Sequence, residues 1–89
     1  MPSQTVVVGS KVGLHARPAS LLVKAAGSAG LSVTVGRPGE KAVNAASLLS
    51  VLALGVKNGD SVEITVADGD GADSVLASLV EIVATDHDE

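Results

Sequence analysis

His15 and Arg17 stand close together in the segment Gly13-Leu14-His15-Ala16-Arg17-Pro18, and their side chains suit the chemistry of phosphoryl groups. A neutral imidazole has a free ring-nitrogen lone pair that can attack phosphorus. A guanidinium presents a planar fork of donors that forms charge-assisted, often bidentate hydrogen bonds to phosphate oxygens. The pair therefore predicts a site at which His15 takes up a phosphoryl group while Arg17 contacts its oxygens.

Pro18 indicates that this segment runs into a helix. Proline is tolerated only in the first turn, so the helix is expected to begin within about three residues upstream, at or next to His15. The helix N-terminus presents unpaired N–H groups and about half a positive charge, which favour a bound anion and a neutral, nucleophilic imidazole. Taken alone, however, a histidine here is more often a helix cap or a surface residue, and Arg17 a surface cation.

Along the rest of the chain, segments whose apolar residues recur at every second position alternate with segments that have the helical i, i+3, i+4 spacing. These patterns predict four strands and three helices. Strands are expected at 5–8, 31–35, 40–43 and 61–66, and helices at 18–26, 47–54 and 73–84. The resulting order is β-α-β-β-α-β-α. A four-stranded antiparallel sheet with three helices on one face would bury every apolar stripe, so we expect an α+β fold of the open-faced β-sandwich type.

Residues that favour helix ends refine these limits. Gly27 and Gly30 are expected to end the first helix, and Gly55 to stop the second. Asn44 and Ser47 are both suited to cap the start of the second helix.

The composition narrows the class of protein. With 89 residues, no aromatic residue and no cysteine, the chain is expected to form one cytoplasmic domain, residues 1–89, around an aliphatic core. A net charge of −4, with the acidic residues concentrated late, argues against nucleic-acid binding. The most apolar run, 48–56, is far shorter than the ~20 residues that span a bilayer, so no membrane contact is expected. His87 lies in the acidic tail and is expected to be solvated, not a metal ligand.

The whole segment 13–19 resembles the active-site motif of the histidine-containing phosphocarrier (HPr) family of the bacterial sugar phosphotransferase system. Residues 43–49 and Leu54-Gly55 resemble that family's second-helix region, and the resemblance covers essentially the whole chain. It implies an HPr domain that is a carrier and not an enzyme, and that needs no cofactor. The implied cycle takes a phosphoryl group from enzyme I, charged by phosphoenolpyruvate, and gives it to IIA domains of sugar permeases.

The resemblance also assigns roles to individual residues. Nδ1 of His15 would carry the phosphoryl group as a pros-phosphohistidine, and Arg17 would stabilise it during transfer. Ala16, Arg17 and Pro18 would form the phosphate-binding turn. Ser47 matches a serine that, in some members, a dedicated kinase phosphorylates to slow sugar uptake and assist a transcriptional regulator, although a plain helix N-cap explains a serine there equally well.

A partner-binding surface is expected beside the motif. Leu48, Leu49 and Leu52 would form an apolar docking patch, with Leu48 and Leu49 the more exposed. Ser20 and Lys24 lie one turn apart on the first helix, so they can share a face near Arg17, although Lys24 alone could be a solvated charge. The carrier is expected to be a monomer that binds its partners transiently.

Other functions stay open on the sequence. The chain could be a purely regulatory relative that binds partners through Ser47, although His15 and Arg17 together argue for a carrier. It could serve a nitrogen-related or a multi-phosphoryl branch instead of general sugar uptake. A small-ligand-binding α+β domain would require a concave site that the sequence does not reveal.

Overall fold

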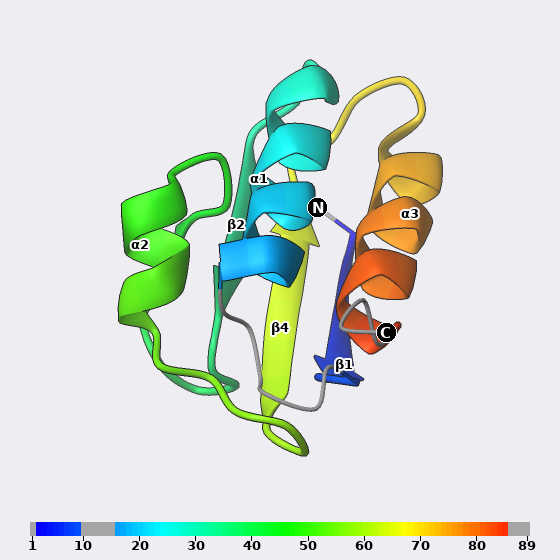
Figure 1. Ribbon diagram of the computed structural model, residues 1–89. Helices are drawn as coiled ribbons and strands as arrows, with labels where there is room; N and C mark the ends of the chain where they lie inside the picture. Colours follow the sequence, from blue (N-terminus) through cyan, green and yellow to red (C-terminus); the bar gives the residue numbers. More distant parts are fainter. Residues whose placement is uncertain (1, 10–15, 86–89) are drawn as a thin grey trace.

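The computed structural model describes residues 2–9 and 16–85, with residues 16–18 described for their backbone only. The elements follow the expected order (Figure 1). They are β1 (Ser3–Val7), α1 (Ala16–Ser28), β2 (Val33–Gly36), β3 (Val43–Asn44), α2 (Leu48–Ala53), β4 (Ser61–Val66) and α3 (Ala72–Ala84).

The strands form one four-stranded antiparallel sheet in the order β1-β4-β2-β3. Val6 pairs with Val62 in the β1–β4 ladder, and Val35 pairs with Ile64 in the β2–β4 ladder. The helices lie on one face of this sheet, as the open-faced sandwich requires (Figure 1). The predicted fold class is confirmed.

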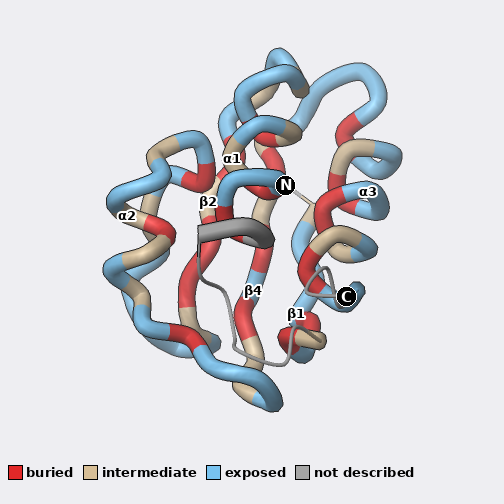
Figure 2. The backbone as a smooth tube through the Cα atoms, in the orientation of Figure 1, coloured by how far each residue is buried: buried red, intermediate tan, exposed pale blue. Residues whose placement is uncertain are grey.

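The core lies between the sheet and the helices and is aliphatic throughout (Figure 2). In β4 the burial alternates strictly, because every second side chain points to the helices. The largest fully buried side chains of the core come from the sheet, from all three helices and from Val8 after β1: Leu22, Ile64, Leu79, Val8, Val35, Val51, Val62, Val66 and Val83. The helical stripes predicted for the first and third helices therefore face the sheet.

The helix ends follow the expected glycines with one difference. Helix α1 continues through Gly27 to Ser28, and the chain reverses at Gly30, whose φ is +74°. Ser47 is the N-cap of α2, because its Oγ accepts a hydrogen bond from Ser50 N at 3.4 Å. Asn44 instead forms a local turn in which its Oδ1 accepts from Ala46 N at 2.9 Å. Gly55, with φ +63°, follows the last turn of α2.

The third strand differs from its prediction at 40–43. It consists of Val43 and Asn44, which pair with Val35 and Thr34. The reason lies in the connection, because Glu40 N donates to Arg37 O at 3.0 Å and closes a turn that ends on Glu40, the residue expected to begin the strand.

Candidate functional site

Helix α1 begins at Ala16, the residue after His15, as Pro18 predicted. Its first turn contains no acidic residue, and the helix is 13 residues long, enough for a developed dipole. The positive end of α1 therefore follows His15 directly in the sequence, and no carboxylate in the first turn offsets its charge. His15 lies outside the described residues, and so do the side chains of Ala16, Arg17 and Pro18. Their predicted roles stay predictions.

The residues predicted to bind partners lie on α1 and α2, which contact each other (Figure 1). Ser20 and Lys24 are exposed on α1. On α2, Leu49 is 81% exposed and Leu48 is 40% exposed, which confirms their expected exposure. Leu52 is half-buried and packs against the core, so only part of its side chain is available to a partner.

Leu21 is a further exposed leucine of α1 that was not among the residues expected to bind partners. It lies on α1 between Ser20 and the buried Leu22 and is 38% exposed. We call the exposed residues Ser20, Leu21, Lys24, Leu48 and Leu49 the α1–α2 face. Helical spacing alone could have separated Leu21 from the core stripe, because it falls outside the i, i+3, i+4 set that contains Leu22.

Ser47 lies half-buried at the start of α2, beside the exposed Leu48 and Leu49. Besides the hydroxyl contact to Ser50 N, its carbonyl accepts from Val51 N at 3.0 Å and its own N–H donates to Asn44 O at 3.1 Å. The structural interpretation as an N-cap is therefore confirmed. A regulatory role for the same hydroxyl is compatible with this place but is not tested by it.

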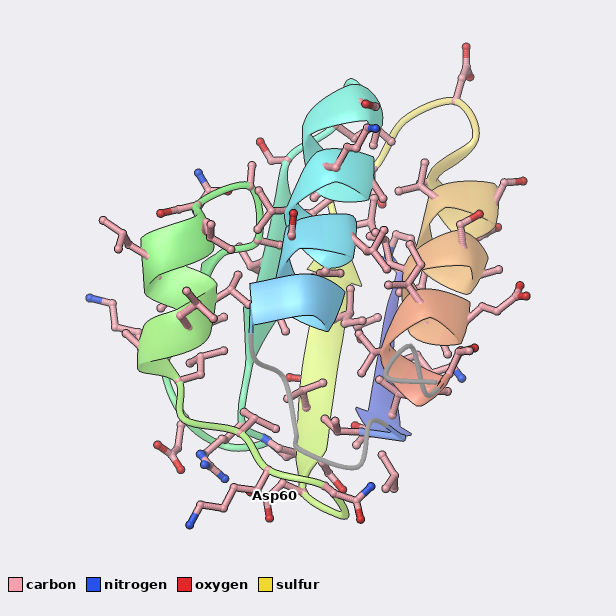
Figure 3. All side chains as sticks on the ribbon, viewed as in Figure 1. Asp60 is labelled. Carbon is pink, nitrogen blue, oxygen red and sulfur yellow. The ribbon has the colours of Figure 1, made fainter. Side chains whose placement is uncertain are left out.

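Arg37 has a structural role that its sequence position did not reveal. Its Nη1 lies 3.3 Å from Oδ2 of Asp60, and its Nη2 donates to the carbonyls of Leu54 and Gly55 at 3.3 and 3.1 Å. It thus joins the β2–β3 turn to the carbonyl end of α2 and to the turn before β4, where Asp60 lies (Figure 3). A hydrogen bond from the Lys57 backbone N–H, followed by the Arg37 guanidinium, holds the pKa of Asp60 below its usual value.

Within the described residues, no helix is long and apolar enough to cross a membrane. The same residues contain no group of three or more His, Cys, Asp or Glu side chains arranged to hold a metal ion.

Comparison with known proteins matches residues 2–85 to the family model PTS-HPr, described as the PTS HPr component phosphorylation site. The phosphocarrier protein HPr of Streptomyces coelicolor is 42% identical over 89 residues, covering 100% of this chain and 95% of that protein. The phosphocarrier protein HPr of Haloferax volcanii is 45% identical over 83 residues, covering 92% of each chain.

Solved structures agree with the sequence matches. HPr-C-His from Thermoanaerobacter tengcongensis superposes with a TM-score of 0.84 at 34% identity, covering 93% of this chain and 91% of that one. The Bacillus subtilis catabolite repression containing protein Crh, described as a dimer with a swapping domain, gives a TM-score of 0.71 at 32% identity over 100% of both chains. Since such a relative is a dimer, the expectation of a monomer stays a prediction.

Proposed function

The chain belongs to the HPr family, and from this premise we propose that it is a phosphocarrier that holds a phosphoryl group on Nδ1 of His15. The observation that carries the proposal is the start of α1 at Ala16, with no acidic residue in its first turn. This places the positive end of a 13-residue helix directly after the only histidine in the matched range, residues 2–85.

The transfer itself needs no metal, cofactor or oxidant. The lone pair of the neutral imidazole nitrogen forms a new P–N bond while the bond from phosphorus to the donor breaks, and the second transfer reverses these roles. The donor is phosphorylated enzyme I, charged by phosphoenolpyruvate, and the acceptors are IIA domains of sugar permeases. The carrier therefore acts as one partner in each of two complexes and is not an enzyme by itself.

The strength of the site suits a carrier. A helix N-terminus stabilises a nearby anion by about 0.3–1 kcal/mol when exposed and by up to ~2 kcal/mol in partly buried geometries. Stabilisation of this size orients the phosphoryl group without making it a thermodynamic sink. A group held much more firmly could not be passed on to the next protein.

The proposal is tested by incubating the protein with phosphoenolpyruvate and purified enzyme I, then measuring its intact mass and mapping the site under mildly alkaline conditions that preserve phosphohistidine. We expect one acid-labile phosphoryl group on His15. A protein that stays unmodified while a known HPr is phosphorylated in parallel would instead favour the second candidate, a regulatory module that acts through Ser47, as the similarity to Crh allows.

We assign partner docking to the α1–α2 face, because it combines exposed leucines with the exposed cation Lys24. Leu49→Ala should raise the KM for enzyme I about 5- to 30-fold, since an interface anchor truncated to alanine costs about 1–2 kcal/mol. The measurement is the initial rate of phosphorylation against carrier concentration. Stability should change by less than about 0.5 kcal/mol, because an 81% exposed side chain contributes little to the core.

Val7→Ala is the matched control for this substitution. Val7 is an exposed aliphatic residue, 56% accessible, but it lies on β1, away from α1 and α2. The KM of the Val7→Ala variant for enzyme I should equal that of the wild type. Equal KM values for Leu49→Ala and the wild type would remove Leu49 from the docking surface.

Ser47 is the proposed site of regulation by a serine kinase, with a transcriptional regulator as a further partner of the phosphorylated form. A phosphate adds about −1.5 to −2 charges at neutral pH, here directly beside Leu48 and Leu49. Such a charge would oppose docking of acidic surfaces on the α1–α2 face and so slow phosphoryl transfer.

Ser47→Ala should abolish ATP-dependent phosphorylation by an HPr serine kinase and lower the free energy of unfolding by about 0.5–2 kcal/mol, because the cap to Ser50 N is lost. Kinase labelling and urea unfolding measure the two effects. Ser50→Ala, which keeps the capping hydroxyl, should retain both labelling and stability. Undiminished labelling of Ser47→Ala would place any regulatory serine elsewhere.

A further inference from the structure

Asn58 and Gly59 are consecutive exposed residues in the turn before β4, which also contains Asp60 (Figure 3). Asp60 N donates to Lys57 O at 3.0 Å and closes this turn. Gly59 has a left-handed backbone, with φ +87°, and a Cβ added to it would meet no atom of the described residues within 4 Å. The backbone nitrogen that follows the Asn58 side chain is therefore open to approach.

An asparagine followed by a glycine contains both partners of an intramolecular reaction. The backbone nitrogen of Gly59 can attack the side-chain carbon Cγ of Asn58, because a bond between these two atoms closes a succinimide ring. Glycine has no Cβ that would oppose the approach. This chemistry makes asparagine one of the thermolabile residues, and the turn places it where water has access.

Both nitrogens of this reaction are hydrogen-bonded to one oxygen. Asn58 Nδ2 donates to Val8 O at 3.3 Å, and Gly59 N donates to the same oxygen at 3.2 Å. The Val8 carbonyl thus opposes both the loss of the Gly59 proton and the rotation of the Asn58 amide. Val8 is itself fixed, because its side chain is 1% exposed and its N–H donates to Asp60 O at 2.9 Å. The reactive pair is therefore restrained while the turn stays against the end of β1.

We propose that Asn58-Gly59 is a deamidation site, restrained in the folded chain by the hydrogen bonds of both residues to the Val8 carbonyl. In the opened turn, Gly59 N forms a bond to Cγ of Asn58, the Cγ–Nδ2 bond breaks, and ammonia leaves with the proton of the Gly59 N–H. Water then opens the succinimide ring. Attack of water at Cγ leaves aspartate at position 58, and attack at the backbone carbonyl carbon leaves isoaspartate.

The product cannot form the contact that restrains the reactant. A carboxylate at position 58 has no N–H to donate, so the hydrogen bond to Val8 O is replaced by repulsion between two oxygens. It also adds a negative charge close in sequence to Asp60, whose Oδ2 already accepts from Lys57 N at 3.0 Å. The modified chain should therefore hold this turn against β1 less firmly, and the Gly59 amide should exchange its hydrogen faster.

The test compares the folded chain with the same chain unfolded in guanidinium chloride, both at mildly alkaline pH, by peptide mapping with mass spectrometry. We expect Asn58 to gain the mass of an amide-to-acid change in both states. The reaction should be about 5- to 150-fold slower in the folded chain, the equivalent of two neutral hydrogen bonds. Hydrogen exchange at Gly59 N reports the same opening, so its protection factor should match this retardation.

Asn44 is the matched control, because it is the chain's other asparagine and is also exposed. The residue after it, Ala45, carries a Cβ and is fully buried, and its N–H donates to Val33 O at 2.9 Å. Asn44 should therefore stay unmodified in the folded chain while Asn58 reacts. The variant Asn58→Asp has no amide at this position, so it should gain no mass there and should elute with the aspartate product.

The proposal is overturned if the peptide that contains Asn58 gains no mass in guanidinium chloride, or if Asn44 reacts as fast as Asn58 in the folded chain. Equal rates at Asn58 in the folded and unfolded chains would refute the restraint by Val8. The result is independent of phosphoryl transfer, because no phosphoryl donor is present in the experiment.

Discussion

His15→Ala should take up no phosphoryl group from phosphoenolpyruvate and enzyme I, whereas the wild-type protein gains one. The loss should be complete and not partial, because the substitution removes the proposed nucleophile itself. The chain contains no cysteine, and its other histidine is His87 in the acidic tail. Intact-protein mass spectrometry after timed incubation measures the effect directly.

The interpretation of this result depends on folding and docking being intact. His15→Ala should still compete with the wild type for enzyme I, because the α1–α2 face is unchanged. Ser47→Ala serves as a positive control and should gain a full phosphoryl group on His15. An acid-labile phosphoryl group on His15→Ala would refute the assignment of His15 and direct the search to His87.

The regular elements could be predicted because their signals are local. The helical spacing of Ala19, Leu22 and Ala26 is the spacing of side chains that are buried in α1, and the alternation of Val62, Ile64 and Val66 is the buried face of β4. Each pattern depends only on residues within one helix or strand, because the spacing of apolar residues alone identifies the side that is buried. The order of elements and the fold class follow from these patterns.

The third strand was placed wrongly because its limits are set by a turn and by strand pairing. Its two pairs with β2 begin at Val43, after the turn closed by Glu40 N and Arg37 O. A short run of mixed residues carries no periodic signal that separates a strand from the preceding loop. The choice between Asn44 and Ser47 as helix cap was likewise open, since both side chains can accept from a nearby backbone N–H.

The contacts of Arg37 and Asn58 could not be predicted, because their partners lie far away along the chain. Arg37 contacts Asp60 and the end of α2, and Asn58, in the turn before β4, donates to the Val8 carbonyl just after the neighbouring strand β1. In the sequence, Arg37 is one of six lysine and arginine residues, and nothing beside it indicates an internal contact. The structure shows that the Arg37 guanidinium bonds internally, to Asp60 and to the carbonyls of Leu54 and Gly55.

Under the proposed function, chemistry and docking fall to different residues, which would let one small chain serve two successive partners. His15, the proposed phosphoryl acceptor, directly precedes α1 in the sequence, while the exposed leucines that would dock partners lie on α1 and α2. Docking and transfer can therefore be altered separately: Leu49 should change KM, whereas residues that contact or position the phosphoryl group should change the saturated rate.

Arg17→Ala should slow transfer from saturating phosphorylated enzyme I about 10- to 150-fold, the rate equivalent of a charged hydrogen bond worth about 1.5–3 kcal/mol. The guanidinium is proposed to stabilise charge on the phosphoryl oxygens as the P–N bonds exchange, a contribution that the helix dipole alone cannot replace. Rapid-quench measurement of one transfer step gives this rate without interference from product release.

Arg17→Lys separates charge from geometry in the same measurement. Lysine keeps the positive charge but lacks the planar fork, so its rate should lie between those of the wild type and Arg17→Ala. Lys41→Ala, which removes one exposed cation from the β2–β3 connection, should transfer at the wild-type rate. If Arg17→Ala instead matches Lys41→Ala, the phosphoryl group is stabilised by the helix N-terminus and by the partner protein, and Arg17 has no part in the transition state.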